Sequence, residues 1–309
     1  MKPIILVVDD SDFQRQIIGG LLKHAIDYDI CFAWDGQDAC DYLEKSPADI
    51  VLTDLLMPGI DGLALIDKLR IEHPDIPVAL VTAHGNEEVA EDALRRGAVN
   101  YIPKAELSER LLPIVQQMVH RVQFDQETRS SVKRSQEAIF EESIASDPSL
   151  IEPLVDRIHA EMLAADTGDR TDRVGTCIAL TEALSNAVLH GNLEITRDDL
   201  AAAQTSKAKA VRERVVQEKM ASPALAKRRV TLQATISGGG ATFVIRDESS
   251  RSPARPDIAV HTEDFLQRGH ARGLVLMQSL TDSLQINPAA NEVKLVAKLA
   301  GKRFNSHVP

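Results

Sequence analysis

Apolar and polar positions in residues 1–122 follow two alternating patterns. Short apolar runs rich in β-branched residues predict buried strands at 4–8, 31–33, 50–53, 77–82 and 99–102. Helical spacing of apolar residues predicts helices at 12–23, 36–44, 62–70 and 87–96, and a long helix from Leu107. Strands that alternate with helices at this spacing predict an α/β domain, with a doubly wound five-stranded parallel sheet.

The pattern changes after residue 122. Residues 123–146 are polar with few apolar anchors and predict a helical connector. Helices are expected next at 149–164, 173–190 and 273–284, and strands at 230–236, 241–246 and 293–299. Because these elements come in blocks, the second domain is predicted to be α+β. The chain thus divides into domains at 1–122 and 147–302, the connector, and a tail at 303–309.

The charge of the chain is concentrated in its first domain. Residues 1–122 hold 11 lysines and arginines against 21 aspartates and glutamates, which is −10 of the total −11. An acidic domain repels nucleic acid but suits a site that gathers carboxylates around a divalent cation. No apolar run is long enough to span a membrane, so we expect a cytoplasmic protein without a membrane partner.

Polar residues lie where the predicted parallel strands end. Asp9 and Asp10 follow the first strand, Asp54 the third and Lys104 the fifth, and Thr82 ends the fourth. Ligands of such sheets bind beyond the carboxyl ends of the strands. Three carboxylates meeting there need a hard cation such as Mg²⁺, and a lysine beside them can pair with a transferred phosphoryl group.

Four motifs carry these residues: VVDDS (7–11), TDLLMPGIDG (53–62), VTAHG (81–85) and YIPKA (101–105). Together they resemble the response-regulator receiver family, whose sheet is flavodoxin-like. The resemblance implies that Asp54 is the phosphoacceptor for a histidine kinase or phosphotransfer protein. It also implies a Mg²⁺ site made by Asp9, Asp10, Asp54 and the Leu56 carbonyl. Lys104 would contact the phosphoryl oxygens, and Thr82 and Tyr101 would form the switch pair.

Three elements of the second domain carry chemistry in a fixed order. The segment TEALSNAVLHGN (181–192) places Glu182, Asn186 and His190 on one helical face. A strand then runs into Asp247, and GHARGLVLM (269–277) opens a glycine-rich helix start, where backbone N–H groups favour phosphate. A polar surface helix is the plain interpretation of the first element alone, and His190 is expected to be structural.

These elements resemble the GHKL-type ATPase domain, in the branch of anti-sigma-factor serine/threonine kinases, a helix layer on a mixed sheet. The resemblance implies bound ATP and Mg²⁺. It assigns the metal to Asn186, water or hydroxyl activation to Glu182, adenine to Asp247, and the phosphate lid to Gly269, Arg272 and Gly273. One departure concerns the adenine aspartate, which the family follows with glycines as D-x-G-x-G, whereas here DESSRSPARPD (247–257) has none.

Two functions therefore stay open. The first is a kinase gated by Asp54 phosphorylation that phosphorylates a small antagonist protein. The second is a non-catalytic partner-switching module that binds an antagonist or a sigma factor through a degenerate ATPase fold. A hybrid histidine kinase is disfavoured, because His120, the one histidine near the connector, precedes Arg121 and no acidic residue. A homodimer through the face that carries Tyr101 is a further expectation.

Overall fold

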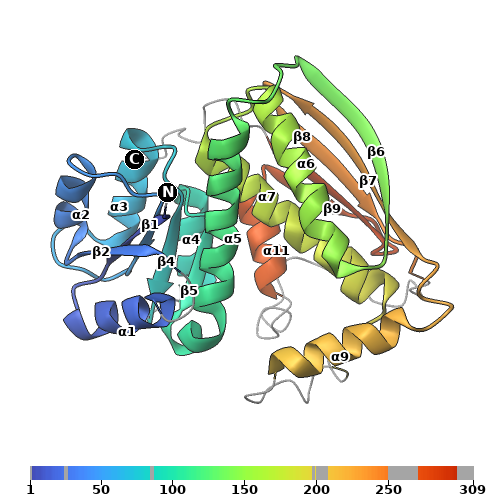
Figure 1. Ribbon diagram of the computed structural model, residues 1–309, viewed down its shortest axis with the longest axis horizontal. Helices are drawn as coiled ribbons and strands as arrows, with labels where there is room; N and C mark the ends of the chain where they lie inside the picture. Colours follow the sequence, from blue (N-terminus) through green and yellow to red (C-terminus); the bar gives the residue numbers. More distant parts are fainter. Residues whose placement is uncertain are drawn as a thin grey trace. The chain divides into compact units, whose positions relative to one another are not determined.

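The computed structural model describes residues 2–23, 27–83, 87–196, 199, 208–249 and 271–297 (Figure 1). The chain forms two compact units. Unit 1 comprises Met1–Val132 and Gly168–Ile178, and unit 2 comprises Lys133–Thr167 and Ala179–Pro309. Among the helices of the described ranges, none has both the length and the apolar composition that a bilayer span requires.

Unit 1 contains a five-stranded parallel sheet in the order β2-β1-β3-β4-β5. Its strands are β1 Ile4–Val8, β2 Asp29–Ala33, β3 Ile50–Thr53, β4 Val78–Thr82 and β5 Asn100–Pro103. All residues of β3 and β4 are buried, as expected for central strands covered on both faces. The predicted α/β architecture of this part is confirmed.

The helices of unit 1 lie close to the predicted ranges. They are α1 Asp12–Lys23, α2 Gly36–Leu43, α3 Gly62–Glu72, α4 Glu87–Arg96 and α5 Leu107–Thr128, with a 3-10 turn at Lys104–Glu106. Aspartates cap two of them: Asp35 accepts from the backbone N–H of Asp38 at α2, and Asp61 from that of Ala64 at α3. Each cap fixes a helix start beside the carboxyl ends of the strands.

Unit 2 contains a five-stranded antiparallel sheet in the order β6-β7-β8-β10-β9. Its strands are β6 Glu137–Ala145, β7 Arg229–Ser237, β8 Gly240–Arg246, β9 Ser283–Ile286 and β10 Glu292–Ala297. Buried and exposed residues alternate along β7, because one face of the sheet packs against helices. The predicted α+β class of this part is confirmed, but the expected mixed sheet is wrong, because all pairings among the described strands are antiparallel.

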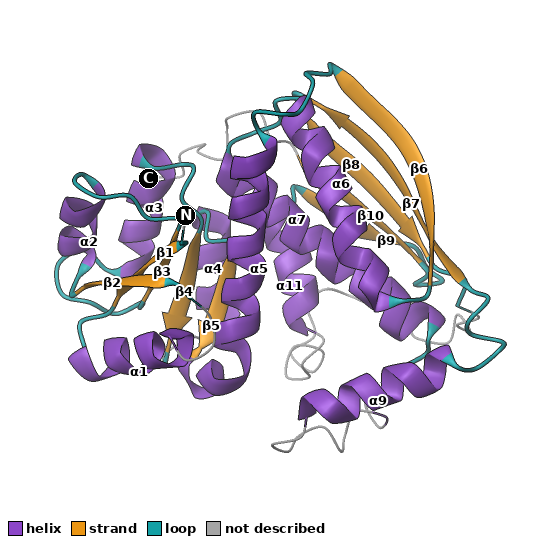
Figure 2. Cartoon of the chain, viewed as in Figure 1, coloured by secondary structure: helices purple, strands orange, loops and turns teal. Residues whose placement is uncertain are grey.

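Unit 2 also contains helices, and Figure 2 shows most of them on one face of the sheet, with α9 away from that face. They are a 3-10 turn Pro148–Leu150, α6 Ile151–Ala164, the second half of α7 Arg170–Ser185, a π-helical turn Asn186–Asn192, α9 Ala208–Met220 and α11 Ala271–Leu280. The π-helical turn continues directly from α7, so the predicted helix 173–190 changes its hydrogen-bonding pattern at Asn186.

Two predicted elements are wrong. The helical connector 123–146 is helical only to Thr128, and 137–145 form edge strand β6, paired with β7 from Glu137 to Ala145. Exposed glutamates in this strand gave it the composition of a surface helix. The helix predicted over 273–284 ends at Leu280, because Ser283–Ile286 pair with β10 as β9.

The start of α7 belongs to unit 1, where arginines and aspartates hold it. Asp125 of α5 is fully buried, and its carboxylate lies 3.2 Å from Nε of Arg170 and 2.7 Å from Nε of Arg173. Arg70 of α3 pairs with Asp169 at 2.7 Å and with Asp172. A buried ion pair of this kind is costly to break, because removal of one partner leaves the other charge in the interior.

Candidate functional site

The carboxylates predicted at the strand ends of unit 1 do meet. One oxygen from each of Asp9, Asp10 and Asp54 lies within 4.8 Å of the others. Asp9 and Asp54 are buried, at 1% and 8% exposed, while Asp10 is exposed. The backbone N–H of Asp54 donates to the carbonyl oxygen of Val8 at 2.8 Å, which extends the pairing of β1 and β3 to the acidic residues themselves.

Lys104 completes this acidic pocket. Its Nζ lies 2.6 Å from Oδ2 of Asp9 and 3.2 Å from Oδ1 of Asp54. Burial raises the pKa of the Asp54 carboxyl above its ordinary value, and the Lys104 ammonium works in the opposite direction. A buried carboxylate with few solvent contacts, held beside a cation, is suited to act as a nucleophile toward phosphorus.

A glycine allows the loop after Asp54 to fold closely over it. A side chain at Gly62, the first residue of α3, would collide with the backbone carbonyl oxygen of Asp54. The Gly62 N–H donates to the Leu55 carbonyl oxygen at 2.9 Å. This contact explains the second glycine of the MPGIDG motif (57–62) as a requirement for close approach.

The other predicted receiver residues lie around the same strand ends. Thr82 is buried at the end of β4, and Tyr101 is half-buried on the neighbouring strand β5. Leu56 has a side chain that is 54% exposed, next to the acidic pocket in sequence. The assigned roles of these residues, like those of the metal ligands, remain predictions.

In unit 2, the start of α11 approaches the functional face of α7 and its π-helical extension. A Cβ added at Gly273 would lie 3.0 Å from Oε2 of Glu182 and 3.7 Å from Nδ2 of Asn186. Glu182 and Asn186 are both half-buried, so their polar atoms remain accessible. Residues predicted from two separate motifs therefore come together. Arg272 precedes Gly273 and is half-buried, whereas Gly269 lies outside the described residues.

Asp247 lies against the far end of the π-helical turn. A Cβ on Gly191 would be 2.6 Å from the carboxyl carbon of Asp247 and 2.7 Å and 2.9 Å from its oxygens. Gly191 thus makes room for the carboxylate predicted to read adenine. The preceding residue, His190, has its Nδ1 2.8 Å from the carbonyl oxygen of Ile195, and its structural role stays a prediction.

Sequence reasoning missed a residue at this end of the site. Asn192 is fully buried and bonds to two segments distant in sequence, through Ser146 at 2.9 Å and the backbone N–H of Glu248 at 2.7 Å. It closes the motif TEALSNAVLHGN, but its partners lie 46 and 56 residues away, so no local pattern reveals them.

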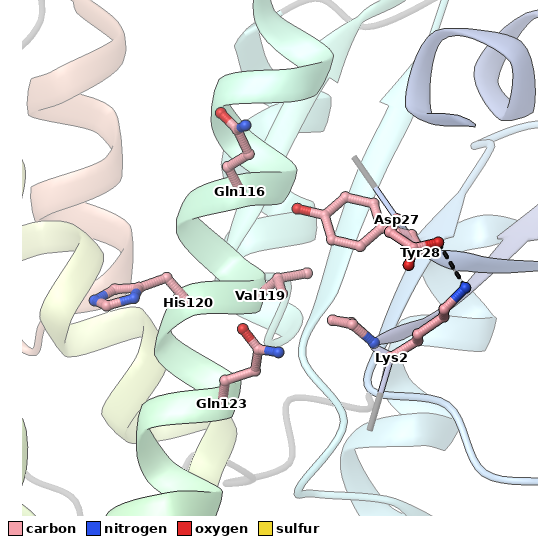
Figure 3. Close-up of a pocket in the computed structure, with 8 residues that line it drawn as sticks. Lys2, Asp27, Tyr28, Gln116, Val119, His120 and Gln123 are labelled. Atoms are coloured by element: carbon pink, nitrogen blue, oxygen red, sulfur yellow. Dashed lines mark hydrogen bonds and ion pairs between the residues drawn. The ribbon is translucent and has the colours of Figure 1, made fainter. Parts of the chain in front are cut away.

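Another hollow lies outside both predicted sites. It measures about 690 Å³ and opens in unit 1 between the starts of β1 and β2 and the middle of α5 (Figure 3). Its lining includes the exposed ion pair of Lys2 with Asp27, 2.6 Å apart, and Tyr28. These residues lie at the amino ends of the strands, so the hollow is separate from the acidic pocket.

Comparison with known families agrees with this division into two sites. Residues 5–116 match the response regulator receiver domain, and residues 144–297 match the histidine kinase-like ATPase domain. Both predicted domain families are therefore confirmed. The assignment of the second domain to the anti-sigma kinase branch stays a prediction.

Curated relatives resemble the first part of the chain. The DNA-binding transcriptional regulator NtrC of Escherichia coli (strain K12) is 32% identical over 129 residues, which cover 42% of this chain and 27% of NtrC. The nitrogen assimilation regulatory protein NtrX of Azorhizobium caulinodans is 31% identical over 127 residues, 40% of this chain and 28% of NtrX. The chain thus spans little more than a quarter of these relatives.

A solved receiver domain resembles the same region. The receiver domain of NtrX from Brucella abortus is 34% identical, with 38% of this chain and 98% of that chain covered and a TM-score of 0.35.

Proposed function

Since this chain carries a receiver domain followed by a histidine kinase-like ATPase domain, we propose that it is a response regulator whose phosphorylation on Asp54 controls an ATP-dependent serine/threonine protein kinase. The phosphoryl group comes from a histidine kinase or a phosphotransfer protein. The substrate is a small antagonist protein of a sigma factor, and the site of action is the cytoplasm.

The observation that carries the first half of the proposal is the acidic pocket. Three carboxylates whose oxygens lie within 4.8 Å of one another form a donor set that fits Mg²⁺, which would be held by Asp9, Asp10 and Asp54 with the Leu56 carbonyl. The bound ion supplies charge neutralisation. An oxygen of Asp54 attacks the phosphorus of a phosphohistidine, the P–N bond breaks, and the electron pair leaves with the imidazole.

The ion pairs of Lys104 would change during this transfer. It holds Asp9 and Asp54 in the unphosphorylated pocket, and the new phosphoryl oxygens would compete for its ammonium. Thr82 lies at the neighbouring strand end, where its hydroxyl can donate to the same oxygens. Movement of Thr82 would leave room for Tyr101 to follow, which is the switch proposed here.

The ATPase half rests on the approach of Glu182, Asn186 and Gly273. The carboxylate and amide oxygens suit Mg²⁺ bound to a triphosphate, and Asn186 would hold that ion. Glu182 would accept the proton of the attacking hydroxyl, and Gly273 and Arg272 would face the phosphates together with Gly269. Asp247 would accept a hydrogen bond from the adenine amino group.

Control of the second half by the first is supported by the course of α7. The helix begins within unit 1, where Arg170 and Arg173 pair with buried Asp125 of α5. The same helix ends in unit 2, shortly after Glu182. A shift of α5 caused by phosphorylation would therefore displace the start of α7, the helix that carries the proposed base Glu182.

The decisive experiment incubates the full chain with Mg-ATP and candidate antagonist domains, with and without acetyl phosphate as a small phosphodonor. Phosphate transfer to a serine or threonine that changes at least about tenfold on Asp54 phosphorylation supports the proposal. Absence of both transfer and hydrolysis in every condition would sink the kinase function.

A second candidate is favoured by the glycine-free run after Asp247. In this alternative the domain binds an antagonist or a sigma factor without turnover. Calorimetry with Mg-ATP decides part of this choice, because micromolar binding that is lost in Asn186→Ala counts against a purely structural domain, and the phosphoryl-transfer assay then tests turnover. Sedimentation with and without acetyl phosphate tests the proposed homodimer through the face that carries Tyr101.

A further inference from the structure

A closed ring of hydrogen bonds in unit 2 joins Asn192, Ser146 and Arg228, and Asn192 also bonds to the residue after Asp247. Nδ2 of Asn192 donates to Oγ of Ser146 at 2.9 Å, Oγ of Ser146 donates to the carbonyl oxygen of Arg228 at 2.8 Å, and Nη1 of Arg228 donates to the carbonyl oxygen of Asn192 at 2.9 Å. The ring joins three segments: the turn after β6, the end of the π-helical turn, and the residue before β7.

The remaining polar atom of Asn192 reaches the residue after Asp247. Its Oδ1 accepts the backbone N–H of Glu248 at 2.7 Å. The amide orientation is fixed by chemistry, since a backbone N–H requires an oxygen opposite it and the ring requires a donor toward Ser146. A fully buried asparagine with both ends engaged has little freedom to move.

Other bonds fix the same turn. The N–H of Ser249 donates to Oδ1 of Asp247 at 2.9 Å, and the carboxylate of Glu248 accepts the backbone N–H of Arg229 at 3.0 Å. Residues 247–249 are thus held at the backbone and at the Glu248 side chain. A glycine-containing loop can approach a base closely because it lacks side chains. This turn contains no glycine and is instead fixed by its hydrogen bonds to Asn192 and Arg229.

We infer that Asn192 is a positioning residue for base recognition: it holds the turn 247–249 so that the Asp247 carboxylate is fixed against Gly191. The inference rests on the proposed binding of ATP. Asn192 ends the same π-helical turn that begins at Asn186. The turn Asn186–Asn192 therefore carries the proposed metal ligand at one end. At its other end it positions Asp247, the proposed adenine contact, through the bond between Asn192 and Glu248.

The inference makes a base-specific prediction. Adenine presents an amino group that donates to a carboxylate, whereas guanine presents a carbonyl oxygen at that position, which a carboxylate repels. If Asp247 loses its fixed place, ATP binding weakens while GTP binding does not. A merely structural role for Asn192 would lower the affinity for both nucleotides alike, through the fraction of folded protein.

The test measures Mg-ATP and Mg-GTP binding to the full chain by calorimetry for Asn192→Ala, Asn192→Asp and a control, Thr167→Val. Thr167 is a fully buried residue of the same unit, and its hydroxyl donates to the carbonyl oxygen of Ser237, at the other end of β7. Asn192→Asp keeps an acceptor for the Glu248 N–H but replaces the donor toward Ser146 by an oxygen and introduces a carboxyl group, so it is the variant closest in shape.

We expect Asn192→Ala to reduce the ATP-to-GTP affinity ratio about tenfold, Asn192→Asp to reduce it less, and Thr167→Val to leave it unchanged. Among the three variants, only Asn192→Ala should show faster hydrogen exchange at the Glu248 backbone amide. This measurement detects the lost hydrogen bond even if the variant is too unstable for calorimetry. An unchanged ratio or an unchanged Glu248 amide overturns the inference. No ATP binding by the unmodified chain overturns the proposed function itself, and the positioning role with it.

Discussion

The two candidate sites are built in different ways. The acidic pocket of unit 1 draws its residues from the carboxyl ends of three strands of one parallel sheet, β1, β3 and β5, where Asp9, Asp54 and Lys104 meet. The site of unit 2 is assembled from one helix, its π-helical extension, a strand end and the start of a later helix. The first needs only a correct sheet, while the second also needs buried polar contacts between distant segments.

The largest expected effect is at the first site. Asp54→Asn removes the only proposed nucleophile while keeping the shape of the side chain, so phosphorylation by acetyl phosphate with Mg²⁺ should fall at least about 100-fold. Intact-protein mass spectrometry measures it. Asp41→Asn, an exposed aspartate that bonds Gln37, is the matched control and should retain phosphorylation. Equal labelling of the two variants would remove Asp54 from its role.

The anchoring of the second site can be broken at Asp125. Its replacement by alanine leaves Arg173, which is only 2% exposed, without its buried carboxylate partner, and should cost about 3–5 kcal/mol of unfolding free energy. Urea unfolding measures this loss. Arg214→Gln removes an exposed pair with Glu218 on α9 and should change the unfolding free energy by no more than about 0.5 kcal/mol. A small loss at Asp125 would show that the start of α7 is not held there.

The base-reading end of the second site is tested by Gly191→Ala. The new Cβ would lie within 2.9 Å of the carboxyl carbon and both oxygens of Asp247, so the carboxylate must move. ATP affinity should fall about tenfold, which corresponds to about 1.4 kcal/mol. Gly239→Ala is the control, since its Cβ would meet nothing closer than 3.9 Å in the turn between β7 and β8. Unchanged ATP binding in calorimetry would contradict this account of the glycine.

The smallest effect concerns pH. Because burial raises the pKa of Asp54 above 3.8, the unfolded chain loses this proton first as pH rises, and the folded state is destabilised until the pH passes the raised value. The advantage of Asp54→Asn in unfolding free energy should therefore be near zero below pH 3.8 and larger at pH 7, on the order of 1 kcal/mol. Urea unfolding at both pH values measures this difference. A stability gain of Asp54→Asn that appears only in acid would contradict the prediction.

The sequence predicted that the residues of the acidic pocket meet, because the information for this is local. Each strand of unit 1 is a short apolar run, and the three carboxylates and Thr82 directly follow or end such runs. Gly62 fits the same pattern, since its motif marked the turn although not the contact with the Asp54 carbonyl oxygen.

The second unit was predicted less completely because its decisive contacts are long-range. Strand β6 has exposed glutamates at an edge, so its composition concealed its pairing with β7. Asn192 and Asp125 are buried polar residues whose partners are distant in sequence: Ser146 and Glu248 for Asn192, and Arg170 and Arg173 for Asp125. No spacing rule predicts such partners.

The grouping of Gly168–Ile178 with unit 1 bears on how this protein can be dissected and recombined. A receiver cut out after residue 132 loses both arginines that cover Asp125, and it also loses Asp169 and Asp172, which pair with Arg70. Exchange of receivers between such proteins must therefore transplant a discontinuous module: the first 132 residues together with the short segment 168–178. A graft made at residue 132 alone would separate Asp125 from Arg170 and Arg173, and Arg70 from Asp169 and Asp172.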